Sequence, residues 1–140
     1  MLLDLAERGS FEIIKQQMIE TFLNADNQNN SDLKELLETM AETVVLESFI
    51  RQLKSLMQGV DLRDELPNVD CPTLVLCGSD DMQSPVEQSR EVARRISNSK
   101  LVTIKGAAHL LPLERPKTVS ELMRQWLIGA LPLDGAELTI

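Results

Sequence analysis

Aromatic residues, cysteine and histidine are all scarce in this sequence. Tyrosine is absent, tryptophan and histidine occur once each, and there are three phenylalanines and two cysteines. A hydrophobic core must therefore be built mainly from leucine, isoleucine, valine and methionine. With 43% hydrophobic and 26% charged residues over 140 positions, the composition is that of a globular chain large enough for a core, and not of a disordered one.

Basic residues are also few, 14 against 22 acidic ones, which gives a net charge of -8. Nucleic acids and anionic membrane surfaces both require a basic face, so we expect neither as a partner. No apolar run approaches the roughly 20 residues of a membrane span. Residues 1–7 lack the basic leader and the long apolar stretch of a signal peptide, so no signal peptide is expected.

The two cysteines flank one predicted strand. An extended chain places Cys71 and Cys77 roughly 20 Å apart, whereas a disulfide requires Cα atoms within about 7 Å. We expect both thiols to be reduced and buried, and we therefore expect a cytoplasmic protein. Their spacing matches no zinc motif, and no other metal-binding cluster is evident, so neither a metal nor another cofactor is expected.

The periodicity of the chain changes near Pro67, which suggests three parts. Residues 1–66 have helical spacing throughout and read as a helical segment, residues 67–130 as an α/β segment, and residues 131–140 as a loose tail. In the first part, helices are predicted over residues 10–23 and 31–59, and Ser31 or Asp32 is a candidate cap for the second. The apolar phase slips near residues 43–45, which indicates two helices or one kinked helix.

After Pro67 the pattern is strand, helix, strand, helix. Residues 73–77 and 101–104 are short apolar runs typical of parallel strands buried on both faces. Between them, Ser84 and Glu87 have the spacing of a capping box at the start of a helix. A last helix is predicted from Pro116 to Gly129. The sequence therefore predicts a two-strand parallel β-α-β-α unit.

An acid and a base follow the two predicted strands. Asp81 comes four residues after the first strand, and His109 comes five after the second. Because the carboxyl ends of parallel strands meet at one edge of a sheet, the two side chains are expected to lie close together. A carboxylate fixes the tautomer of an adjacent imidazole, which can then act as a general base. The alternative is a structural role, with Asp81 near a helix dipole and His109 a hydrogen-bonded loop residue.

The segments around these residues resemble a known superfamily. Residues 71–85 look like the acid-bearing strand and loop of the α/β-hydrolases, and residues 104–116 look like their histidine loop. The resemblance implies a truncated α/β-hydrolase fold in which Asp81, and not Asp80, is the triad acid and His109 is the triad base. It also implies that the helices before Pro67 are a cap over the active site. Within the superfamily, the chain looks nearest to small-molecule esterases, lactonases and carbon–carbon bond hydrolases.

The nucleophile elbow of that superfamily, Gly-x-Ser-x-Gly, does not occur in the 140 residues. Ser79 is a poor replacement, because nothing nearby supplies an oxyanion hole. Whether the chain is an enzyme is left open, and three functions are considered. The first is the C-terminal portion of a hydrolase that is inactive alone and forms a homodimer. The second is one chain of a split enzyme, completed by an N-terminal hydrolase half. The third is a non-catalytic module that binds an apolar small molecule between the cap helices.

Overall fold

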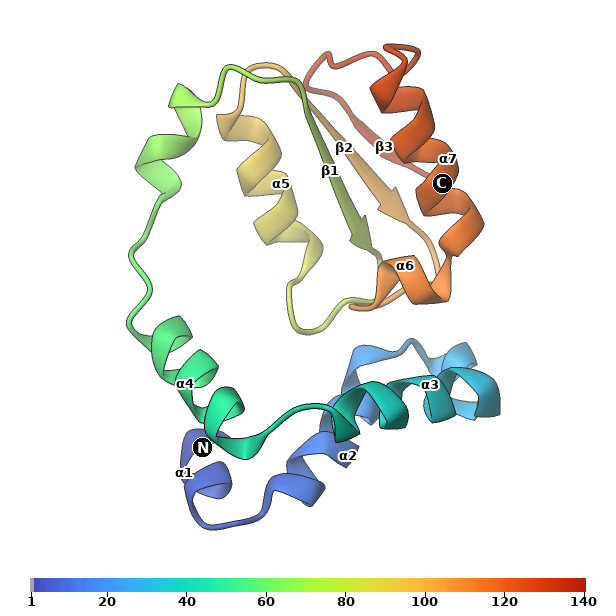
Figure 1. The fold of residues 1–140 in the computed structure, drawn as a ribbon. Coiled ribbons are helices and arrows are strands. Elements are labelled where there is room, and N and C mark those ends of the chain that lie inside the picture. The colour runs from blue at the N-terminus through green and yellow to red at the C-terminus, as the bar shows by residue number, and fades with distance from the viewer. Residues whose placement is uncertain (1) are drawn as a thin grey trace.

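The computed structural model describes residues 2–140, without the side chain of Leu2. Helices dominate the first half of the chain, and a small sheet with flanking helices forms the second (Figure 1). The elements are α1 (Leu2–Glu7), α2 (Phe11–Phe22), a 3₁₀ turn (Ala25–Asn29), α3 (Ser31–Glu42), α4 (Leu46–Met57), a second 3₁₀ turn (Arg63–Asn68), β1 (Thr73–Gly78), α5 (Val86–Arg95), β2 (Ser99–Ile104), α6 (Leu111–Glu114), α7 (Pro116–Leu127) and β3 (Glu137–Thr139).

The helical part follows the apolar periodicity of the sequence. Ile14 and Phe49 are buried in a cluster shared by α1, α2 and α4, where the Phe49 ring lies 5.2 Å from that of Phe11. The chain leaves helical geometry at residues 43–45, so the expected break gives two separate helices. Asn30, and not Ser31 or Asp32, caps α3, because its side chain accepts a hydrogen bond from the Leu33 N–H at 3.2 Å.

The sheet has three parallel strands in the order β1-β2-β3, one more than the two expected. The third comes from residues 131–140, which were expected to be a loose tail. That expectation was wrong because the tail completes backbone pairs with β2: Ile140 donates to the Thr103 carbonyl at 3.0 Å and accepts from the Lys105 N–H at 2.8 Å. All six residues of the central strand β2 are buried.

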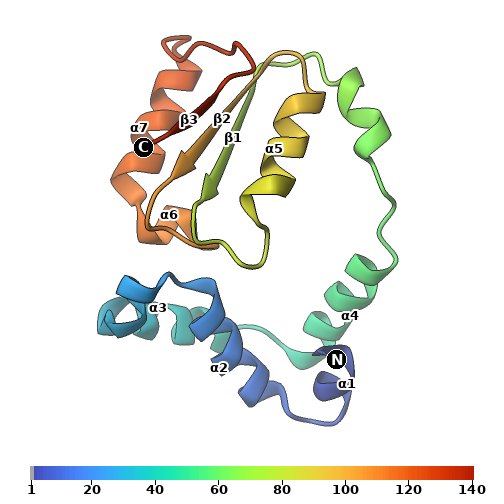
Figure 2. The same cartoon turned by 180° about the vertical axis from the view of Figure 1, so that it is seen from behind.

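Helices cover both faces of this sheet (Figure 2). Side chains alternate along each strand, so Val75 and Leu101 pack toward Ala93 of α5. Leu76 and Val102 pack on the opposite face in the cluster that contains Val119 and Leu122 of α7. Cys77 is buried and Cys71 is exposed, which corrects the expectation that both thiols are buried; both are free.

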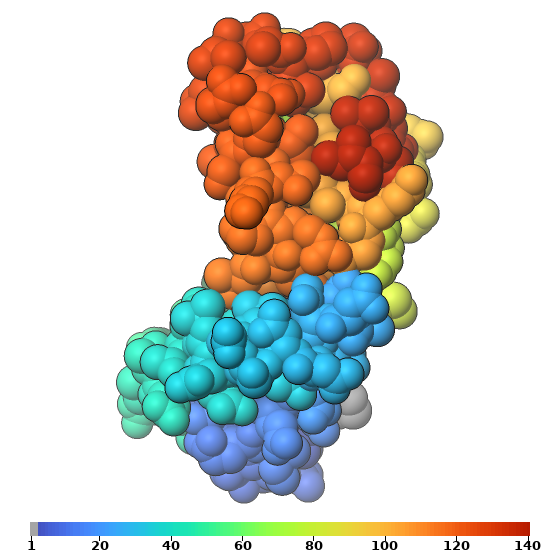
Figure 3. Space-filling model, turned by 90° about the vertical axis from the view of Figure 1, so that its right-hand side faces the viewer, coloured from blue at the N-terminus to red at the C-terminus, as the bar shows by residue number. Residues whose placement is uncertain are grey.

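The two parts meet beyond the carboxyl ends of the strands. Leu110 and Leu113, at α6, pack against a buried cluster formed by Leu23, Leu33 and Leu37. Figure 3 shows the α6–α7 segment resting directly on the 3₁₀ turn and α3. The strand ends therefore point at the helical part, and any site at these ends lies between the two. No helix within residues 2–140 has the length and apolar character needed to cross a membrane.

Candidate active site

The structure brings Asp81 and His109 together at the strand ends. The Nδ1 atom of His109 lies 3.0 Å from Oδ2 and 3.2 Å from Oδ1 of Asp81. The Asp81 side chain is 8% exposed, whereas that of His109 is 34% exposed. The acid is thus enclosed, and the ring reaches the surface of the site.

The Asp81 carboxylate is fixed by its own loop. Its Oδ1 atom accepts hydrogen bonds from the backbone N–H groups of Gln83 and Ser84, both at 2.9 Å. This arrangement takes the place of the predicted capping box: α5 begins at Val86 after Pro85, and no side chain caps it. The two backbone donors therefore fix the orientation of the carboxylate, which faces the imidazole.

The neighbouring residues Ser79 and Asp80 are turned away from this pair. The Ser79 hydroxyl donates to Oδ1 of Asp80 at 2.7 Å and accepts from the Gly106 N–H at 3.0 Å. The single hydroxyl proton of Ser79 is therefore directed to an exposed acid, and the imidazole does not receive it. This geometry does not favour Ser79 as a nucleophile.

The loop after β1 and the loop after β2 are joined along their backbones. Ser79 donates to the Ile104 carbonyl and Asp80 to the Ala107 carbonyl, both at 2.9 Å. Gly78 lies so close that a Cβ atom at this position would be 2.2 Å from the Ala107 oxygen. A residue without a side chain is required here, and the close approach sets the spacing between the acid loop and the histidine loop.

Glu114, a residue that the sequence analysis did not identify, binds the backbone of the histidine loop. Its side chain is buried, and Oε1 accepts from the Ala108 N–H at 2.7 Å. Its Oε2 accepts from the Asn24 N–H at 2.9 Å and from Nδ2 of Asn27 at 3.0 Å. One carboxylate thus joins the residue before His109 to the turn after α2. Asn24 and Asn27 are 90 and 87 positions away in sequence, so no local pattern reveals these contacts.

The end of α2 also contacts His109 directly. The His109 N–H donates to the Phe22 carbonyl at 3.1 Å, and the two rings lie 4.9 Å apart. Asn24 and Arg115 both donate to the carbonyl of Gly106. The helical part therefore positions the histidine and also forms one wall beside it.

This arrangement can perform general base chemistry. When Nδ1–H of His109 donates to Asp81, the Nε2 atom carries a lone pair that can accept a proton from a hydroxyl or a water. Among the residues that the structure describes, no hydroxyl is hydrogen-bonded to Nε2. Within residues 2–140, no three or more His, Cys, Asp or Glu side chains gather as a metal site would require.

Comparisons with known proteins agree with this geometry. Residues 56–137 match the model of a hydrolase family described as TAP-like protein. The chain is 28% identical over 95 residues to (E)-2-((N-methylformamido)methylene)succinate hydrolase of Acinetobacter baylyi, covering 66% of this chain and 36% of that protein.

Two solved structures are also similar. A thermophilic esterase from Thermogutta terrifontis, with malate bound, is 32% identical with a TM-score of 0.83; the match covers 90% of this chain and 48% of that one. An α/β-hydrolase enzyme from a Medee basin deep-sea metagenome library is 25% identical with a TM-score of 0.78, covering 94% of this chain and 50% of the other.

The chain thus spans about a third of the Acinetobacter relative and about half of each solved structure. The expected fold class is confirmed, since the match includes both the helices before Pro67 and the strands after it. The family model covers more than half of the 140 residues. The chain therefore belongs to the α/β-hydrolases, in the family described as TAP-like protein.

Proposed function

We propose that residues 1–140 supply the acid and the base of a hydrolase that acts on small-molecule esters, lactones or related acyl compounds. The observation that carries the proposal is the 3.0 Å contact between the His109 ring and an enclosed Asp81. In the reaction, His109 takes the proton of a serine hydroxyl as it attacks the carbonyl carbon. It then returns that proton to the leaving group, while Asp81 stabilises the imidazolium.

The nucleophile is proposed to come from a polypeptide segment outside these 140 residues, since they contain no Gly-x-Ser-x-Gly. The isolated chain should then be inactive on activated esters. A chimera tests this: residues 1–140 replace the matching half of the Thermogutta terrifontis esterase. Hydrolysis of p-nitrophenyl butyrate by the chimera, with none by the isolated chain, is the expected result. Turnover by the isolated chain that His109→Gln abolishes would contradict it.

The unpaired edge of β1 is where a second polypeptide is expected to bind. Among residues 2–140, β1 pairs with β2 alone, and its outer edge has no partner strand. An open strand edge favours pairing with another strand. We expect an N-terminal hydrolase half to occupy this edge when present, and a second copy of the chain to do so otherwise. A monomer in light scattering at micromolar concentration would refute self-association. The two free cysteines are consistent with a reducing compartment, and we place this function in the cytoplasm.

A second candidate function is binding of an apolar small molecule. A hollow of about 230 Å³ lies between α2, α3 and α4, and its lining is almost wholly apolar. Phe22 and Leu110 belong to that lining. The Phe22 ring contacts the His109 ring, and Leu110 follows His109 in the sequence. The same hollow could hold the acyl part of a substrate or a ligand that is never hydrolysed. Hydrolysis by the chimera separates the two.

A further inference from the structure

The hollow between the cap helices contains one charged side chain, and that residue breaks a regular pattern. On α2, positions 11, 15, 18 and 22 follow the spacing of a single helical face, and all four line the hollow. Three of them are Phe11, Met18 and Phe22. The fourth is Lys15, at a place where the pattern calls for an apolar residue.

Lys15 is held at the boundary of the hollow. Its side chain is only 16% exposed, and its Nζ lies 5.1 Å from the centre of the Phe11 ring. With Ile19 and Ala41 it forms the wall between the apolar hollow and an outer, polar groove of about 450 Å³ between α2 and α3. Lys15 therefore borders both spaces, and its ammonium group lies over the ring of Phe11, which lines the hollow.

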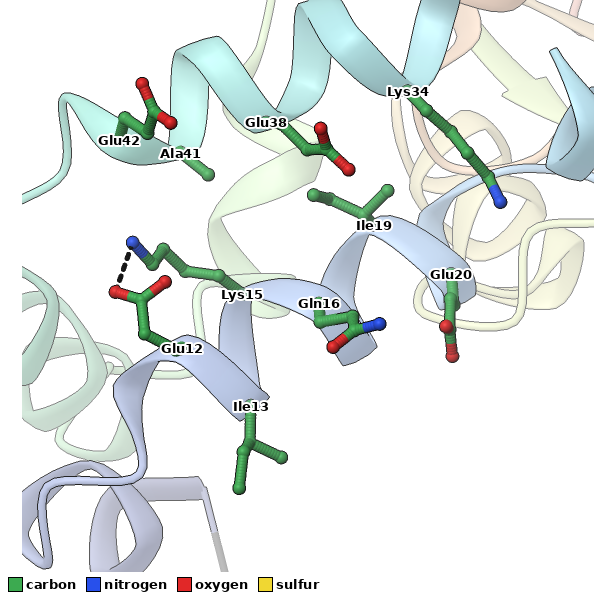
Figure 4. A pocket seen from close by; sticks show the side chains of 10 residues that line it. All are labelled: Glu12, Ile13, Lys15, Gln16, Ile19, Glu20, Lys34, Glu38, Ala41 and Glu42. Atoms are coloured by element: carbon green, nitrogen blue, oxygen red, sulfur yellow. Dashed lines mark ion pairs between the residues drawn. The ribbon is translucent and has the colours of Figure 1, made fainter. Parts of the chain in front are cut away.

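The ammonium group of Lys15 pairs with an exposed carboxylate. Figure 4 shows its Nζ directed at Glu12, whose Oε1 lies 2.6 Å away. The Glu12 side chain is 83% exposed, so water competes for this pair and its net contribution to stability is small. A carboxylate presented from the apolar side could take the place of Glu12 at lower exposure, where a charge-assisted hydrogen bond is stronger.

The two ends of the hollow are a defined distance apart. Lys15 and Phe22 are seven positions apart on one helix, which corresponds to two turns or about 10 Å. The Phe22 ring is in contact with the His109 ring. A molecule that places a carboxylate on Lys15 and runs along the apolar wall therefore brings its other end to the candidate base.

We infer that the hollow binds an aliphatic chain that ends in a carboxylate, and that the preferred ester substrates are half-esters of medium-length dicarboxylic acids. The substrate assignment rests on the proposed function, whereas the binding site does not require turnover. The carboxylate pairs with Lys15, the methylene chain contacts Met18 and Phe22, and the ester carbonyl lies at His109.

Binding to the 140-residue chain tests the site. We would follow the methyl signals of Met18 and Met40, which both line the hollow, during titration with monomethyl suberate, with neutral methyl octanoate and with the short monomethyl succinate. Monomethyl suberate should bind most tightly of the three. Lys15→Met should weaken its binding about tenfold and leave methyl octanoate unchanged, because only the charged contact is lost.

Three further variants make the result decisive. Lys15→Arg should restore binding of monomethyl suberate, and Glu12→Gln should strengthen it by removing the competing carboxylate. Lys34→Met is the matched control, since Lys34 lines only the outer groove (Figure 4) and its loss should change nothing. Equal binding of the charged and neutral probes would overturn the inference, and so would absence of binding by both.

Failure of this inference is distinguishable from failure of the proposed function. Selective binding of monomethyl suberate without any hydrolysis by the chimera would refute the proposed function and leave the carboxylate site standing. Hydrolysis of neutral esters with no preference for the half-ester would refute the substrate assignment and leave the proposed function standing.

Discussion

The Asp81 carboxylate accepts hydrogen bonds from two backbone N–H groups and faces His109 Nδ1, and this arrangement should set the tautomer of the ring. Because His109 is the only histidine, its ¹⁵N signals can be assigned without ambiguity. We expect the neutral ring to be protonated at Nδ1 in the natural chain. Asp81→Asn should shift the ring to a mixture of tautomers, since an amide accepts and donates equally well. Asp80→Asn, one residue away and turned from the ring, should leave the tautomer unchanged.

Glu114 should stabilise the join between the helical part and the histidine loop. All of its partners are donors, so replacing one carboxylate oxygen by an NH₂ group leaves a buried N–H without an acceptor. Glu114→Gln is expected to lower the free energy of unfolding by about 1–3 kcal/mol in urea titrations. The same substitution at the exposed Glu121 is the control and should have a much smaller effect. An equal loss from both variants would contradict the role given to Glu114.

The proximity of Asp81 and His109 was predictable from the sequence because each residue closely follows a predicted strand. Chain order and sheet topology alone therefore predicted their proximity. Glu114 and Asn24 were not predictable, because their contact joins residues 90 positions apart and depends on how α6 packs on the turn after α2. The expected capping box is absent for a local reason: the Ser84 N–H already donates to Asp81.

The end of β1 sets the separation of the two loops that carry the site. Gly78→Ala would place a methyl group 2.2 Å from the Ala107 oxygen, which is backbone and cannot rotate away. We expect a loss of about 1–3 kcal/mol in the free energy of unfolding, together with displaced amide signals for Ala107 and Ala108. Gly129→Ala is strained at its φ of +71°, but its Cβ meets nothing within 4 Å, so it should displace neither loop signal. Unchanged loop signals in Gly78→Ala would contradict the close approach.

The attachment of β3 should depend on pH. Its Glu137 carboxylate pairs with Arg90 of α5 at 2.7 Å, and the guanidinium holds the pKa of Glu137 below its ordinary value of 4.5. A depressed carboxyl pKa contributes stability that is present above the unfolded pKa and is lost as the pH falls through the folded one. Hydrogen-exchange protection of the Ile140 and Lys105 amides should therefore fall between pH ~6 and pH ~3.

Arg90→Gln should reduce this pH dependence. Part of the pH dependence should persist, because Lys100 pairs with Asp134 and also lowers the pKa of that carboxyl. Arg124→Gln is the control, because Arg124 pairs with Glu121 within α7, where it helps hold the pKa of Glu121 at about 2. Equal protection at both pH values in the natural chain would exclude a contribution of the Arg90–Glu137 pair.

The apolar pattern predicted α2, α3, α4, α7 and the two strands β1 and β2, and the start signals at residues 84–87 predicted α5. It missed β3 because that strand is three residues long and exposed, so no buried face leaves a periodic signal. Pairing with β2 and the Arg90 contact stabilise it instead. Both are tertiary interactions and do not appear in a local window of sequence.

For the whole molecule, the central feature is a site formed between two parts of the chain. The helical part contributes Phe22 and the contacts that hold the histidine loop, and the loops after β1 and β2 contribute Asp81 and His109. In the proposed function, a further polypeptide binds at the free edge of β1 and supplies a hydroxyl to Nε2 of His109, which has no hydroxyl partner within residues 2–140. The account therefore predicts activity for the completed assembly and none for the chain alone.

The most direct test is the effect of single substitutions on kcat/KM in the chimera with the Thermogutta terrifontis esterase. His109→Gln and Asp81→Asn should each lower kcat/KM by roughly 10⁴-fold, as expected when the base or the acid that orients it is lost. Asp80→Asn should leave kcat/KM unchanged. A chimera that retains its activity without His109, or that depends on Asp80 as strongly as on Asp81, would contradict the assignment of this pair as the acid and base of the site.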